Sequence, residues 1–125
     1  MTEPDTIDIT RELDRYHPDR VALDRELTER VSRAHAAMTA AFADILAATT
    51  EAEEAESYWA QGSQTTSEWL AANLRVHGKT ARMWTRMAKQ LKDFPAFQER
   101  MAVGELNVDQ VRQLLRYADP ANQAE

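Results

Sequence analysis

The sequence of 125 residues contains no cysteine, only three glycines and four prolines. Without cysteine the chain has no disulfide framework and no thiolate metal site. The scarcity of glycine and proline argues against a loop-rich or all-β fold, and no stretch is apolar for long enough to span a membrane. The acidic start also lacks the apolar run of a secretory signal. These absences predict a soluble, cytoplasmic and mostly helical protein.

Ala, Leu, Glu, Arg and Gln are abundant and favour helices, and the length suits one domain with a modest core. Residues 1–19 are polar and show no sustained period, so we expect a flexible tail there. A single helical domain is expected over residues 20–118, followed by a frayed C-terminus over residues 119–125.

A long helix is predicted from Arg20 to about residue 50, because its apolar positions step alternately by four and three residues. These positions are Leu27, Val31, Ala34, Met38, Ala41, Ile45 and Ala48, with Phe42 and Leu46 widening the stripe. The acidic, Ala-rich stretch to Trp59 can extend this helix by some turns. Two interpretations stay open: the seam packs within one chain, which is favoured for a single seam, or it docks another chain.

The central stretch Thr65–Leu91 predicts two helices joined by a tight turn. Thr65 and Glu68 form a capping box that opens the first helix, which runs to Arg75 or Val76. Its expected buried residues are Trp69, Leu70 and Leu74. Gly78 is expected to provide a left-handed or otherwise tight turn, and the second helix should run from about Lys79 to Lys92.

One face of this second helix is predicted to be core and the other cationic. The apolar stripe is Ala81, Trp84, Met87, Ala88 and Leu91, and the opposite stripe is Lys79, Arg82, Arg86 and Lys89. From Arg75 to Lys92 there are six basic residues and no acid, although the whole chain has a net charge of −6. A polyanion would meet this local positive field.

The predicted nucleic-acid-binding residues are therefore Arg75, Lys79, Arg82, Arg86 and Lys89, with Thr80, Thr85 or Gln90 near base edges. The competing interpretation is that the basic residues only solubilise an amphipathic helix. The lack of acids in this stretch favours nucleic acid.

Two shorter helices should follow. Pro95 interrupts the preceding helix and starts a new one to about Val103, which buries Phe97 and Met101. Gly104 is expected as a left-handed cap, and a last helix begins near Asn107, with Val108, Val111, Leu115 and Ala118 on one face. The predicted fold is all-α: a long N-terminal helix packed on a helix-turn-helix-like pair and two shorter C-terminal helices.

Several of these residues form a pattern that helix propensity alone does not explain: Ser67-Glu68-Trp69-Leu70-Ala71, Thr80-Ala81-Arg82, Phe94-Pro95 and Gly104-Glu105-Leu106. The pattern resembles the actinobacterial 13E12-repeat family, whose N-terminal region is known as domain of unknown function 222 (DUF222). The resemblance covers roughly residues 20–118 and is most specific over 65–115. Many members have Ser or Ser-Pro in the central turn, where this chain has Val76-His77-Gly78-Lys79.

Members of that family are often followed by a C-terminal HNH nuclease domain, so the resemblance implies work on nucleic acid. The family's domain also continues with further helices, and we therefore expect this chain to be a fragment or a naturally short relative. The resemblance implies DNA and a C-terminal nuclease domain as partners. A second copy of the chain is the other expected partner, through the seam of residues 20–50, and no membrane is involved.

No catalytic site is expected in this chain. An HNH site needs a histidine base and clustered metal ligands, whereas His17, His35 and His77 are isolated. Gly78-Lys79-Thr80 matches only the end of a phosphate-binding loop and lacks its preceding strand. The predicted function is a non-catalytic nucleic-acid-binding or targeting domain without cofactor or metal. The alternative is a helical interaction or dimerisation module that uses residues 20–50.

Overall fold

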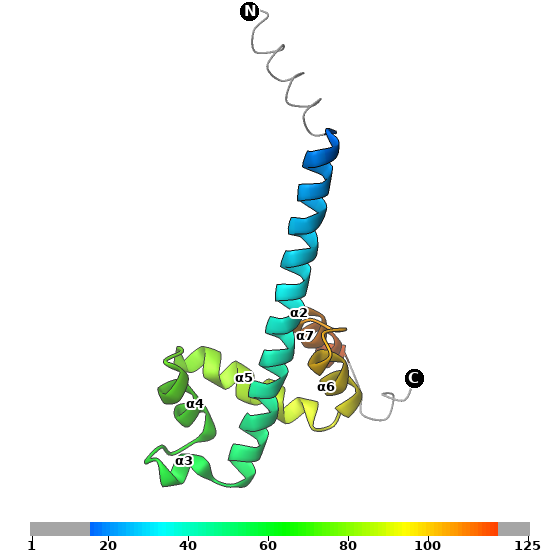
Figure 1. Ribbon diagram of the computed structural model, residues 1–125. Helices are drawn as coiled ribbons and strands as arrows, with labels where there is room; N and C mark the ends of the chain where they lie inside the picture. Colours follow the sequence, from blue (N-terminus) through cyan, green and yellow to red (C-terminus); the bar gives the residue numbers. More distant parts are fainter. Residues whose placement is uncertain (1–15, 118–125) are drawn as a thin grey trace, which may run out of the picture. The chain divides into compact units, whose positions relative to one another are not determined.

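The computed structural model describes residues 16–117, which contain helices and no strand (Figure 1). The all-α fold class is therefore confirmed for this part of the chain. Most of the expected tail and the whole expected C-terminal segment, with Ala118, lie outside the described residues. The described residues belong to two compact units, one up to His35 and one from Ala36 onward. Among the helices of residues 16–117, none combines the length and apolar character that a membrane span needs.

The described helices are α2 (Pro18–Glu54), α3 (Ser57–Ala60), α4 (Thr66–Leu74), α5 (Gly78–Leu91), α6 (Pro95–Ala102) and α7 (Val108–Tyr117). Helix α2 begins two residues before the predicted start. Proline suits this position because the first turn of a helix requires no intrahelical N–H donor. The backbone N–H of Asp19 donates to Nδ1 of His17 at 3.2 Å, which satisfies one of the free donors at the helix start.

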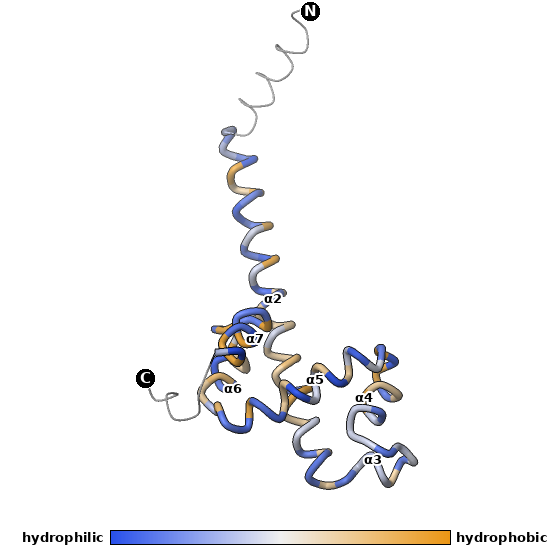
Figure 2. Tube along the Cα trace, turned by 180° about the vertical axis from the view of Figure 1, so that it is seen from behind, coloured by the Kyte–Doolittle hydropathy of each residue, from blue (hydrophilic) through white to orange (hydrophobic). Residues whose placement is uncertain are grey.

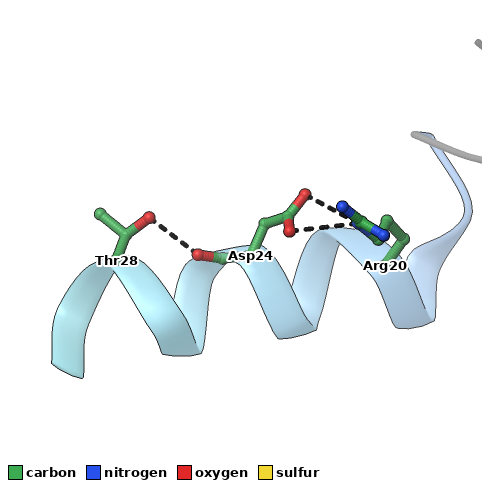
Figure 3. A network of polar contacts seen from close by, with 3 residues as sticks. All are labelled: Arg20, Asp24 and Thr28. Atoms are coloured by element: carbon green, nitrogen blue, oxygen red, sulfur yellow. Dashed lines mark hydrogen bonds and ion pairs between the residues drawn. The ribbon is translucent and has the colours of Figure 1, made fainter. Parts of the chain in front are cut away.

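The first unit contains residues 18–35 of α2, and all of these residues are exposed. Its polar contacts are local. Arg20 Nε donates to Asp24 Oδ1 at 3.2 Å, and Thr28 Oγ1 donates to the carbonyl of Asp24 at 2.8 Å (Figure 3). An exposed side-chain pair such as Arg20–Asp24 stabilises a helix by only about 0.2–0.5 kcal/mol.

The second unit has one hydrophobic core to which α2, α5, α6 and α7 contribute, together with the residue that precedes α6. Its buried members are Ala43, Leu46, Met87, Ala88, Leu91, Phe94, Met101, Val111 and Leu115. Trp84 packs edge-on against Phe42, with ring centroids 5.1 Å apart. Apolar and polar residues alternate along these helices, as expected when one face of each is buried (Figure 2).

The face of α2 that enters this core overlaps the predicted stripe only in part. Met38, Ala41 and Ala48 of the seam are exposed and Ile45 is half-buried, whereas Leu46, which widens the stripe, and Ala43, which was not predicted, are each 1% exposed. At 100° per residue the buried face is rotated from the seam by roughly 120°. The sequence does not indicate this face clearly, because alanine packs equally well on either face. Two of the buried residues, Thr39 and Thr49, are also polar. Over residues 38–48 the predicted stripe therefore packs within the chain mainly through its widened edge, Phe42 and Leu46.

The left-handed turn before α5 is formed by Arg75 and not by Gly78. Arg75 has φ 55° and ψ 39° and ends α4, whereas Gly78 is the first residue of α5. A second left-handed residue, Glu56, separates α2 from α3, so the extension toward Trp59 is a short separate helix. Leu74, expected to be buried, is 43% exposed at the end of α4.

The predicted cap residues Thr65, Gly104 and Asn107 are confirmed, but the capping box of α4 forms only in half, because Glu68 Oε2 accepts from the N–H of Gln64 at 2.8 Å and not from that of Thr65. The backbone N–H of Glu68 donates to Thr65 Oγ1 at 3.1 Å. At α7, the N–H of Gln110 donates to Asn107 Oδ1 at 2.8 Å, and the N–H of Asn107 donates to Gln110 Oε1 at 2.9 Å. Gly104 follows α6 with φ +80°, as expected for a left-handed cap. These caps define where α4, α6 and α7 begin or end.

Candidate nucleic-acid interface

Helix α5 carries the predicted basic stripe, and its first turn is capped by His77. The backbone N–H of Lys79 donates to Nδ1 of His77 at 3.1 Å. A Cβ placed on Gly78 would lie 3.3 Å from Nη1 of Arg82, so the Arg82 guanidinium lies over the first turn of α5. Helical side chains commonly lean toward the N-terminus in this way. An anion at this position would meet both the guanidinium and the positive end of the helix dipole.

The two faces of α5 are separated as predicted. Ala81, Met87, Ala88 and Leu91 are all less than 5% exposed, and Trp84 is half-buried. The opposite face has the exposed side chains of Lys79, Arg82, Arg86 and Lys89. The structure thus brings four of the five predicted binding residues onto one face of one helix.

The fifth predicted residue, Arg75, lies in the turn before α5 and is exposed. It is the αL residue of that turn, a conformation that costs a non-glycine residue about 1–2 kcal/mol. Because Arg75 lies outside α5, it is not part of the row that the other four residues form along that helix.

No carboxylate pairs with the basic stripe within residues 16–117. The ion pairs found there join Arg20 to Asp24 and Lys92 to Glu54. Lys92, the last base of the predicted cationic run, is therefore neutralised locally, with Nζ 3.0 Å from Glu54 Oε1. The outer face of α5 keeps its positive field in this part of the chain.

Two hollows lie next to each other along this face. The first has a volume of about 340 Å³ and is lined by Lys79, Thr80, Arg82, Met83 and Arg86. The second, of about 290 Å³, is bounded by α5 and α7 and is lined by Met83, Arg86, Met87, Gln90, Arg112, Leu115 and Arg116. Met83 and Arg86 line both, so the hollows form one continuous surface.

Sequence reasoning missed Arg112 and Arg116 as members of this surface. They lie four residues apart and each directly follows a buried residue of α7, Val111 or Leu115. The spacing shows that they share a face of α7, but only the packing of α7 beside α5 shows which surface they join.

Of the side chains predicted near base edges, Thr80 and Gln90 line the hollows. Thr85 is turned toward the interior and is half-buried. Its Oγ1 donates to the carbonyl of Ala81 at 2.8 Å and accepts from Ser67 Oγ at 3.1 Å. Thr85 therefore ties α5 to α4 and has no free hydroxyl hydrogen for a base.

Within residues 16–117 there is no group of three or more His, Cys, Asp or Glu side chains that would hold a metal ion. His77 and His17 instead accept backbone hydrogen bonds at helix starts, and His35 is exposed.

Comparisons of the chain with protein-family models, with curated proteins and with solved structures found no match. The resemblance to the 13E12-repeat family therefore stays a prediction that depends on the motifs quoted above.

Proposed function

We propose that this chain is a non-catalytic nucleic-acid-binding domain that contacts phosphates through the outer face of α5. The observation that carries the proposal is the exposed row of Lys79, Arg82, Arg86 and Lys89, with no carboxylate paired to it among the described residues. Lysine and arginine side chains supply most of the affinity in sequence-independent binding to nucleic acid.

The row is displayed on a helix whose other face is held in the core, so the cations keep a fixed spacing. Ordering of the binding helix then costs little on association, since α5 is already folded. The resemblance to DUF222 supports the same class of ligand and favours DNA. It also suggests a targeting role beside an HNH nuclease domain.

Fluorescence anisotropy with a short labelled DNA duplex tests this proposal. Four phosphate contacts give a log–log salt dependence of about −3 to −4, because each neutralised phosphate releases nearly one counterion. Affinity for a single module should be on the order of micromolar at physiological salt, and mostly independent of sequence.

The decisive variant is Arg82→Glu/Arg86→Glu, which we expect to abolish binding without changing helix content. A matched control is Arg25→Glu/Arg30→Glu, which changes the net charge equally at exposed positions of α2. If the control loses as much affinity as the α5 variant, net charge and not the α5 surface determines binding, and the proposal fails.

A second candidate function is self-association through residues 18–35. In this unit Leu23, Leu27 and Val31 recur every fourth residue and are 45%, 44% and 69% exposed. Helices gain most of their stability in proteins from packing of such an apolar face. The segment has four acids and four arginines, so its balanced charges complement a second copy better than a strongly charged partner.

Light scattering after size exclusion tests this second candidate. A dimer should have twice the chain mass of 14.2 kDa, and Leu27→Glu/Val31→Glu should convert it to a monomer. A wild-type monomer at high protein concentration would rule self-association out.

A further inference from the structure

The second hollow is a groove between α5 and α7 that combines a positively charged rim with an apolar base. Arg86 from α5 and Arg112 and Arg116 from α7 form the charged part of its lining. Met87 and Leu115, which are 4% and 7% exposed, form the apolar part. Like charges that surround one hollow repel each other, and this repulsion is stronger beside apolar groups than in open water. The arrangement therefore favours an anion in the groove.

Guanidinium groups suit a phosphate in particular. Each offers a planar pair of N–H donors that matches two phosphate oxygens, and it stays charged at every physiological pH. The amide of Gln90, also in the lining, adds donors and an acceptor for a neighbouring sugar or base. No carboxylate lines this groove.

The groove is also continuous with the first hollow on α5. Met83 and Arg86 line both, so a polyanion that contacts Lys79 and Arg82 reaches Arg86 next and then the α7 arginines. A single small anion would occupy only the first hollow or only the groove, whereas a polynucleotide backbone supplies phosphates to both at successive positions.

We propose that the phosphate-binding surface extends from α5 across this groove to α7, where Arg112 and Arg116 contact further phosphates of the same nucleic-acid backbone. This inference rests on the proposed function and adds two contacts to it. α7 thus binds the ligand directly and does not merely support α5.

Two double variants separate the helices: Lys79→Gln/Arg82→Gln removes cations that line only the first hollow, and Arg112→Gln/Arg116→Gln removes those that line only the groove. With the labelled duplex at about 0.1 M salt, two lost phosphate contacts should weaken binding by about 10-fold to 60-fold and reduce the salt slope by about 1–2. Both variants should show this loss.

Two further variants control for charge and folding. Arg25→Gln/Arg30→Gln removes the same net charge from α2 and should change affinity less than about twofold. Arg112→Lys/Arg116→Lys keeps the charge and should retain the salt slope that the Gln variant loses. This difference would show that the positive charge at these positions contributes to binding. Circular dichroism checks folding, and the single variant Arg112→Gln replaces the double one if that one unfolds.

The outcomes distinguish this inference from the function on which it rests. If the α7 variant behaves like the α2 control while the α5 variant loses affinity, the extension to α7 is wrong and the α5 proposal stands. If the wild-type protein shows no salt-dependent binding to the duplex, both are overturned.

Discussion

Gly104→Ala tests the close approach between the turn after α6 and helix α2. Gly104 has φ +80°, and a Cβ there would lie 3.1 Å from the Cβ of Ala36. The left-handed backbone costs an alanine about 1–2 kcal/mol. The tight contact adds an overpacking cost of about 1 kcal/mol or more, since the neighbouring backbone must shift. We expect a total loss of about 2–3 kcal/mol in the free energy of unfolding.

Gly62→Ala is the matched control, because Gly62 has φ +83° and no heavy atom within 4 Å of the added Cβ. It should lose only the backbone part, about 1–2 kcal/mol. Asparagine tolerates the left-handed conformation better, so Gly62→Asn should be nearly neutral while Gly104→Asn stays destabilising. Urea denaturation followed by circular dichroism measures all four variants. Equal losses at the two positions would refute the contact with Ala36.

Substitutions at Trp84 and Thr65 test the packing and one helix cap of the same unit. Trp84→Ala should destabilise by about 3 kcal/mol, the lower end for a large aromatic residue, because Trp84 is half-buried against Phe42; a near-neutral result in the same urea assay would mean that Trp84 is not part of the packing. Thr65→Ala should cost about 1 kcal/mol by removing the acceptor for the Glu68 N–H. Thr65→Ser keeps that acceptor, so a loss as large as that of the alanine variant would show that the cap bond contributes nothing.

The sequence predicted the second half of the fold well because its signals there are local. A capping residue, a proline at a helix start and a left-handed glycine each act within one turn of helix. Accordingly, the observed starts of α4, α6 and α7 lie within one residue of those that Thr65, Pro95 and Asn107 indicate. The separation of α5 into an apolar and a basic face is equally local, because it follows from helical periodicity.

The buried face of α2 was not predictable in the same way. Alanine is common on several faces of α2 and does not mark the core. Thr49 is buried although it is polar, and its hydroxyl is satisfied within its own helix by donating to the carbonyl of Ile45 at 2.6 Å. Arg75 takes the left-handed conformation although a glycine lies three residues later. Arg112 and Arg116 belong to the candidate site only because α7 packs beside α5, and no local sequence pattern encodes this packing.

Whether the outer face of α5 binds phosphates is tested most directly by the salt dependence of binding to duplex DNA, measured for the wild-type protein and for Arg82→Glu/Arg86→Glu. We predict a log–log slope of about −3 or steeper for the wild type, and no binding by a variant that keeps the helix content and melting temperature of the wild type. A wild-type affinity that does not change with salt, or a folded variant that binds as well as the wild type, would contradict this prediction.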